Sequence, residues 1–307
     1  MTVLFRDPVH DGATDPTLIR HHDTGDWWMF YTARRAGHEG TGVAWVHGTD
    51  IGIAVSTDDG AHWEYRGLAR GLDHEPGRNT YWAPEVIHHD GRYHMYVTYL
   101  RGVRADWSGP RHILHYTSAD LEHWEFVSVL PLPGDKAIDA CVWPLPAEAG
   151  GGWRMWFKDE ADGSTIHAAD SPDLFSWRPI GRALEGDQAH EGPTVLAHAG
   201  AHWMLTDCWS GLLVYRSTDL THWERLPGAL LDGPVPAHHA AALGQGDDAA
   251  WLVYFTHPEP EHAPRRSRVE ALPLTVTDGR LVPGAATTPL RLRAELTAPL
   301  RGGTAAR

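Results

Sequence analysis

Five short, aromatic-rich runs of apolar residues recur along the chain at intervals of about 50 residues. Each follows a shorter β-type run and a polar turn, and no strong helical periodicity is visible. Short alternating runs bounded by turn residues predict β-strands throughout. The aromatic runs lie at 27–31, 93–97, 153–157, 202–206 and 251–255. The preceding runs begin at 15, 83, 139, 192 and 238.

A turn motif with Ser, Asp and a closing Trp occurs four times. Its Ser and Asp side chains are suited to bond nearby backbone amides, and the Trp returns to cover the hairpin. The histidines that precede three of these tryptophans are interpreted as structural. The four copies span 56–63, 118–124, 171–177 and 217–223. The three histidines are His62, His123 and His222.

Repeated multi-strand units of this length favour an all-β fold, a five-bladed β-propeller in a single domain. The alternative is a β-sandwich whose hairpins are similar by accident. We expect residues 1–290 to form the propeller, with a strand at 267–274 completing the fifth blade. Residues 291–307 are predicted to form a C-terminal tail, and its end, 302–307, has the composition of a disordered segment.

The charge and composition of the chain disfavour some classes of binding partner. The 307 residues include 26 Lys and Arg against 40 Asp and Glu, a net charge of −14, which disfavours nucleic acid and anionic membranes. Cys141 and Cys208 form no disulfide framework and are interpreted as core residues. With no signal peptide or membrane-spanning run visible, the expected location is cytoplasmic, although a mature secreted form stays open. The 15 Trp residues offer flat faces on which sugars stack.

Three carboxylates are expected to meet at the propeller axis. The first strand of each blade lines this axis, so the strand starts bring Asp15, Asp139 and Glu191 to one mouth. Carboxylates held together in a partly apolar site raise the pKa of at least one of them. Glycoside hydrolysis needs one carboxylic acid to protonate the leaving oxygen and one carboxylate to activate water or attack the sugar.

The motifs that contain these carboxylates resemble the family 43 glycoside hydrolases over roughly residues 10–257. They are Asp15-Pro16-Thr17, Trp82-Ala83-Pro84-Glu85-Val86, Ile138-Asp139 and Glu191-Gly192-Pro193. The resemblance implies a five-bladed propeller that cleaves arabinofuranosyl or xylosyl linkages with inversion. It assigns Asp15 as general base, Asp139 as pKa modulator and Glu191 as general acid. Ala140 departs from the family, which usually has Pro after the third-blade Asp.

Further residues are candidates for substrate or metal binding. Trp82 is expected to wall the pocket, and Arg78, Trp209 and His238 to contact the sugar. By resemblance, His238, or His239 one residue on, would bind a calcium ion or a water. No cofactor is expected to be required, apart from a structural calcium at the axis.

Other side chains have structural interpretations. Glu85 is predicted to face a neighbouring blade and pair with an arginine, and the histidine pairs at 21–22 and 88–89 to lie in solvated turns. Lys158 and Glu160 follow an inner strand and either reach the pocket or pack.

Alternative functions remain open from the sequence. Another five-bladed glycosidase acting on fructans or galactosides would keep the fold and change the substrate. A non-catalytic sugar-binding propeller would keep the tryptophan platforms without needing every carboxylate. In each case the expected partner is an oligosaccharide or glycoside.

Overall fold

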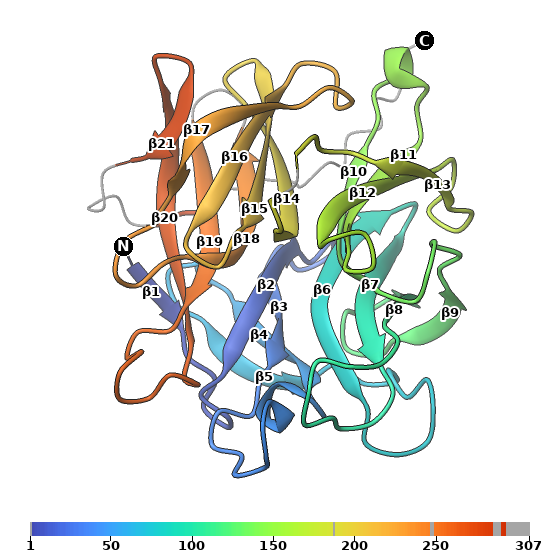
Figure 1. The fold of residues 1–307 in the computed structure, drawn as a ribbon, viewed down its shortest axis with the longest axis vertical. Helices are drawn as coiled ribbons and strands as arrows, with labels where there is room; N and C mark the ends of the chain where they lie inside the picture. The colour runs from blue at the N-terminus through green and yellow to red at the C-terminus, as the bar shows by residue number, and fades with distance from the viewer. Residues whose placement is uncertain (1, 187, 246–248, 285–289, 293–307) are drawn as a thin grey trace.

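Five antiparallel sheets surround a central axis in the computed structural model, which describes residues 2–186, 188–245, 249–284 and 290–292 (Figure 1). The five-bladed β-propeller is therefore confirmed, and the β-sandwich alternative is wrong. The described residues contain two three-residue 3-10 helices, η1 (Ala44–Val46) and η2 (Ala147–Ala149). Neither is long or apolar enough to cross a membrane.

Each blade is a meander whose first strand lies nearest the axis. Blade one comprises β2 (Ala13–Arg20), β3 (Trp27–Ala33), β4 (Asp50–Ser56) and β5 (Glu64–Leu68). Blade two comprises β6 (Thr80–His89), β7 (Arg92–Leu100), β8 (His112–Ser118) and β9 (Glu125–Val129). Blade three comprises β10 (Ala137–Pro144), β11 (Trp153–Asp159), β12 (Thr165–Ser171) and β13 (Arg178–Arg182). Blade four comprises β14 (Glu191–His198), β15 (Ala201–Asp207), β16 (Leu212–Ser217) and β17 (Glu224–Leu230).

The fifth blade closes the ring with a strand from the other end of the chain. It comprises β18 (His238–Gln245), β19 (Ala249–Thr256) and β20 (Arg268–Thr277), and the last of these matches the predicted strand at 267–274. The N-terminal strand β1 (Thr2–Phe5) pairs with β20 on its outer side, and β21 (Arg280–Pro283) pairs with the rest of β20. Pairing the chain's two ends leaves no gap between first and last blades, a device that the repeat pattern did not predict.

A β-bulge interrupts each inner strand about two residues after its start. The register shifts at the same place in all five inner strands. Four of the bulge residues have positive φ: Asp15 at 51°, Ala83 at 45°, Asp139 at 59° and Gly192 at 54°. Bulges and left-handed residues bend a strand and redirect side chains, and they concentrate at functional sites. This repeated bulge sets the direction of the Asp15 and Asp139 side chains.

The aromatic second strands fill the space between blades. Trp27, Trp156 and Trp203 are almost wholly buried, each on the second strand of its blade. The Ser–Asp–Trp motifs form the outer hairpins as predicted: in the second copy, Asp120 accepts the backbone N–H groups of Glu122 and His123. The same carboxylate contacts the imidazole of His123 at 2.9 Å, which supports the structural interpretation of this histidine.

The segment after the fifth blade returns to the first. The indole Nε1 of Trp27 donates a hydrogen bond to the Leu292 carbonyl. The Leu292 N–H in turn donates to the Asp59 carbonyl. Leu290 and Leu292 are buried there. The tail predicted from residue 291 thus begins with a docked residue, and the end predicted to be disordered, 302–307, lies outside the described residues.

Candidate active site

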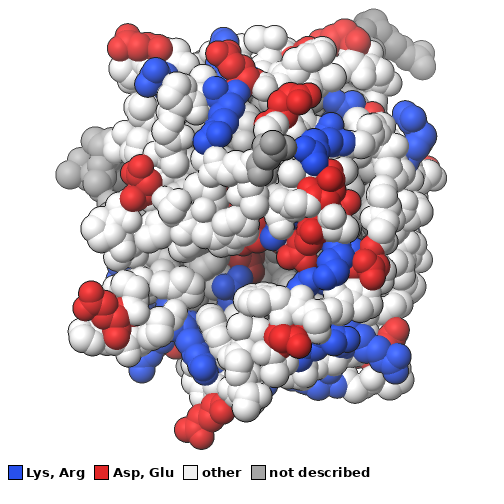
Figure 2. Space-filling view, viewed as in Figure 1, with Lys and Arg blue, Asp and Glu red and all other residues white. Residues whose placement is uncertain are grey.

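A cavity of about 310 Å³ opens where the inner strands begin. Figure 2 shows acidic and basic side chains gathered around a hollow near the centre of one face of the molecule. The cavity contains all three predicted carboxylates, flanked by cations and three indoles. Its lining is Asp15, Arg34, Val46, Trp82, Trp107, Ile138, Asp139, Lys158, Glu160, Ser164, Glu191, Trp209 and His239.

Asp15 is a buried carboxylate surrounded by groups that stabilise its charge. Arg34 Nη2 lies 3.3 Å from Oδ1, and the Thr14 hydroxyl donates to Oδ2 at 3.0 Å. Burial would raise its pKa, but the charges of Arg34 and His239, together with hydrogen bonds from Thr32 and Thr14, outweigh burial, so the pKa of Asp15 lies below its usual value. Asp15 is therefore ionised at neutral pH, the state that a general base requires.

Asp139 occupies the equivalent bulge position in blade three and has the opposite electrostatic character. Burial, reinforced by the charges of Glu191 and Asp15, raises the pKa of Asp139 to about 7, against the lowering effect of His239 and Lys158. Its Oδ2 accepts the N–H of Gly192 at 3.1 Å. Two carboxyls at matching positions of the repeat thus differ in protonation near neutrality.

Glu191 is held at both carboxylate oxygens. Lys158 Nζ lies 2.7 Å from Oε2, and the Trp209 indole donates to Oε1 at 3.0 Å. Lys158 also contacts Glu160, which in turn pairs with the buried Arg111. Although burial lowers the pKa of Lys158, the charges of Glu191 and Asp139 raise it above its usual value, so this lysine is a permanent cation in the cluster.

Of the two candidate histidines, His239 rather than His238 lines the cavity. His239 Nδ1 lies 3.7 Å from Asp15 Oδ1. Burial lowers the pKa of His239, but the negative charges of Asp139 and Asp15 raise it by more than burial lowers it. The net shift of this pKa is therefore upward. His238, predicted to bind substrate, instead directs Nδ1 to Asp207 at 3.2 Å and stacks on Phe255. The register shift between His238 and Ala240 decides which of the two histidines faces the cavity, and spacing alone does not reveal it.

Two other predicted contacts differ in the structure. Arg78 is outside the cavity lining, because its guanidinium bonds the Gly48 carbonyl and pairs with Asp50. Glu85 faces the neighbouring blades as expected, but its partners there are the Thr17 hydroxyl and the Val142 N–H rather than an arginine. Burial raises the pKa of Glu85 to about 7.

Sequence reasoning placed Trp82, Trp209 and the three carboxylates at the cavity, and it missed Arg34 and Trp107. Arg34 follows β3 directly, so the rule that the ends of second strands reach the mouth would have found it. Trp107 lies in the long loop between β7 and β8. No repeat marks such a loop, and sequence pattern alone offered no signal for it.

The donors at the axis do not fit the structural calcium implied by the resemblance. Calcium takes six to eight oxygen ligands, whereas His239 is an imidazole with a raised pKa set against Asp15. Among the described residues, no group of three or more His, Cys, Asp or Glu side chains is arranged to hold a metal ion.

Comparison with known families identifies the chain. A family model described as a probable glycosyl hydrolase domain, related to glycosyl hydrolase family 43, matches residues 2–232. The chain belongs to this family. The resemblance inferred from the four motifs is thereby confirmed.

This family-43-related hydrolase domain has one curated relative of note. Raffinose invertase of Escherichia coli is 27% identical over 158 residues, which cover 45% of this chain and 33% of the invertase. The match therefore spans only a third of the length of that relative.

Solved structures share the propeller at low sequence identity. A thermostable family-43 glycoside hydrolase superposes with a TM-score of 0.69 at 19% identity, covering 94% of this chain and 97% of that one. A family-43 β-1,3-galactosidase gives 0.68 at 16%, covering 92% and 98%. The α-L-arabinanase of Cellvibrio cellulosa gives 0.62 at 17%, covering 89% and 95%. At such identities these likenesses show the fold.

Proposed function

We propose that the protein is a glycosidase that hydrolyses arabinofuranosyl or xylosyl linkages with inversion. The observation that carries this proposal is the cavity that joins Asp15, Asp139 and Glu191. Its carboxyls differ in environment, with Asp15 ionised and Asp139 protonated below about pH 7. An ionised carboxylate suits the base role, and a carboxyl that keeps its proton in the same cavity suits the role of regulating the neighbouring acid.

The proposed reaction uses one water molecule. Asp15 accepts a proton from this water as its oxygen attacks the anomeric carbon, and Glu191 donates a proton to the leaving glycosidic oxygen as that bond breaks. Asp139 and Glu191 repel each other when both are ionised, so the cluster favours keeping a proton on one of them, which is the modulating role of Asp139. Lys158 has the opposite effect, because it stabilises the charged forms of both carboxyls. Trp82 and Trp209 would supply stacking faces for the sugar.

The pentoside substrate is supported by the arabinanase among the structures with this fold. Because the chain is also similar to an invertase and to a galactosidase, fructosides and galactosides are the alternative substrates. The non-catalytic sugar-binding propeller is disfavoured by the charge arrangement, since binding alone needs no carboxylate kept protonated beside an ionised one.

The test is hydrolysis of nitrophenyl arabinofuranosides, xylosides, galactosides and fructosides by the wild type, E191Q and a matched control, E185Q. Glu185 is exposed. We expect release from a pentoside by the wild type. On the corresponding oligosaccharide, whose leaving oxygen has to be protonated, hydrolysis should fall at least about a hundredfold in E191Q and be unchanged in E185Q. NMR of the first product anomer distinguishes inversion from retention. Binding of arabinose oligosaccharides by calorimetry without any release of sugar would instead favour the sugar-binding propeller.

A further inference from the structure

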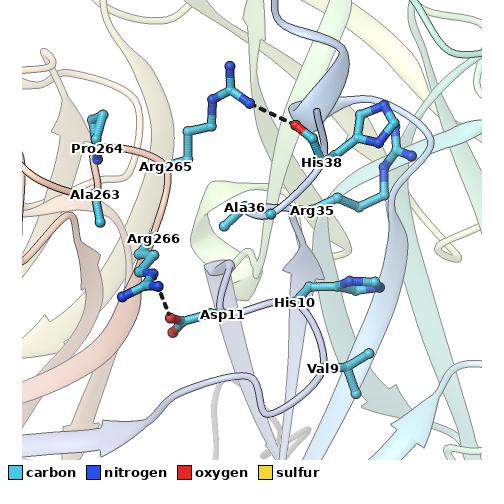
Figure 3. Close-up of a pocket in the computed structure, with 11 residues that line it drawn as sticks. Val9, His10, Asp11, Arg35, Ala36, His38, Ala263, Pro264, Arg265 and Arg266 are labelled. Atoms are coloured by element: carbon cyan, nitrogen blue, oxygen red, sulfur yellow. Dashed lines mark hydrogen bonds and ion pairs between the residues drawn. The ribbon is translucent and has the colours of Figure 1, made fainter. Parts of the chain in front are cut away.

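A second, larger cavity lies beside the candidate active site, between loops of the first and fifth blades (Figure 3). Its volume is about 720 Å³. Three loops form it: one leads into β2, one follows β3, and one joins β19 to β20. The lining residues are Val9, His10, Asp11, Arg35, Ala36, Gly37, His38, Ala263, Pro264, Arg265 and Arg266.

The lining of this cavity is basic, although the chain has a net charge of −14. Arg35 donates to the Ala44 and His47 carbonyls, and Arg265 donates to the His38 carbonyl at 2.8 Å. These partners are uncharged, so they orient the two guanidinium groups without neutralising them.

Asp11 is the carboxylate in the lining, and its charge is already shared. Arg266 approaches it at 3.3 Å, as Figure 3 shows, and Arg6 approaches its other oxygen at 2.9 Å. Arg266 also pairs with Glu259 at 3.9 Å, so Arg6 and Arg266 are balanced by two carboxylates. The remaining positive charge of the lining comes from Arg35 and Arg265. The cavity is therefore suited to an anion.

This cavity and the candidate active site share a wall. Arg34 lines the active site and contacts Asp15, and the next residue, Arg35, lines the basic cavity. At the other end of the wall, Asp11 lies four residues before Asp15 on the segment that enters β2. The two cavities are therefore neighbours, lined by consecutive residues that follow β3.

We propose that the basic cavity binds a carboxylate-bearing sugar, a hexuronic acid residue attached to the sugar hydrolysed at Asp15 and Glu191. This inference rests on the proposed glycosidase function. Arginine guanidinium groups match the two oxygens of a carboxylate. Val9, Ala36, Ala263 and Pro264 add apolar walls, which suit the C–H face of a pyranose ring better than a bare inorganic anion.

The test is direct binding, measured by calorimetry and ligand-observed NMR, with sodium glucuronate, glucose and sodium sulfate as probes. The variants are R265Q, R265K and a control, R66Q, because Arg66 lies on the outer strand β5 and pairs with Glu122. We expect glucuronate to bind more tightly than glucose or sulfate. Its affinity should fall about tenfold in R265Q, fall less in R265K, and stay unchanged in R66Q.

Folding of the variants is checked by thermal denaturation, because Arg265 also stacks on Trp45. Should R265Q unfold, R265K and the dependence on sodium chloride still decide, since an ion-paired carboxylate is released as salt rises. Equal binding of glucose, equal or tighter binding of sulfate, or equal affinity of all variants would overturn the proposal. Failure of the glycosidase proposal is seen separately, as absence of hydrolysis on the nitrophenyl panel, because these binding measurements require no turnover.

Discussion

Lys158 is one of two lysines in the chain, and it lies inside the carboxylate cluster. Its side chain is 4% exposed and its Nζ contacts Glu191 and Glu160. A buried cation between carboxylates costs desolvation free energy that only good ion pairs offset. At the residue scale, this lysine sets how readily the neighbouring carboxyls lose their protons.

Replacing this lysine tests its influence on the acid. In K158M the carboxylate cluster loses the buried cation that lowers the pKa of Asp139, so the alkaline limb of the pH–rate profile should move to higher pH. The maximal kcat should also fall, because Trp209 alone then holds Glu191. The measurement is kcat/KM against pH, with K136M as the control at the other lysine. An alkaline limb that stays in place would show that Lys158 does not act on the acid.

Glu85 offers a second residue-scale prediction, on stability. Its pKa of about 7 in the folded protein exceeds the ordinary value of 4.5. The folded protein therefore holds a proton that the unfolded chain releases between these pH values, and this stabilisation is lost as the pH rises through 7. Glutamine can keep the bonds to Thr17 and Val142 without ionising.

E85Q should accordingly lose less stability than the wild type between pH 5 and pH 8, by about 2 kcal/mol of unfolding free energy. Urea denaturation at the two pH values measures it, with exposed Glu125→Gln as the control. In E85Q the free energy of unfolding should still fall somewhat as the pH rises, because the pKa of Asp139 lies in the same range. An identical pH dependence in E85Q and the wild type would refute the assignment of a buried, protonated Glu85.

At the scale of the element, the bulge recurs in every inner strand, but the group that accepts the hydrogen bond of its N–H changes between blades. The bulge N–H of Ala83 donates to Thr32 on the preceding blade, and that of Asp139 donates to Thr98. Lys158 holds the corresponding register position in blade three and cannot accept such a bond. The next bulge N–H, that of Gly192, is accepted by Asp139 instead. Breaking the repeat at this point is what links Asp139 to the Glu191 strand.

Gly192 makes that geometry possible. A Cβ at this position would lie 2.7 Å from Cγ of His239, and its φ of +54° favours glycine. G192A should therefore lose about 1–3 kcal/mol more stability than G200A, and its kcat/KM should fall because His239 is displaced. Gly200, in the β14–β15 hairpin, is the matched control, since its φ is also positive but its Cβ would meet open space. Thermal denaturation and kinetics on both variants decide, and equal losses would contradict the close contact with His239.

At the scale of the whole molecule, ring closure depends on four residues at the start of the chain. Phe5 of β1 pairs with Val269 of β20 and packs on Tyr31 of blade one. It therefore joins the first and last blades, whose loops also enclose the basic cavity. Edge strands otherwise present unpaired backbone groups, and the pairing of β1 covers one of them.

F5A should lower the free energy of unfolding by about 3 kcal/mol, because it leaves a cavity at the junction of the first and last blades. The control is F126A on the outer strand β9. Phe126 is 45% exposed and contacts His74 and Tyr116, so its loss should cost only about 1 kcal/mol. Both values come from denaturant unfolding. Equal effects of the two substitutions would show that β1 does not contribute to closure.

The sequence by itself determined the five units, their strands and the carboxylates at the mouth. Repetition makes each hairpin visible locally: the aromatic run fills the gap between blades, the turn motif ends the outer hairpin, and the carboxylates recur near the starts of inner strands. Arg34 and Trp107 were missed because one follows a second strand and the other lies in an unrepeated loop.

Only the tertiary structure decided which side chains face the cavity and what charge they carry. The bulge turns His239 inward and His238 toward Asp207, and a single register shift has this effect because strand side chains alternate with a period of two. The difference between Asp15 and Asp139 likewise depends on neighbours that are distant in sequence: Arg34, at the end of the next strand of the same blade, in one case, and Glu191, on the next blade, in the other. Burial and charge at close range act through space, and sequence separation does not encode them.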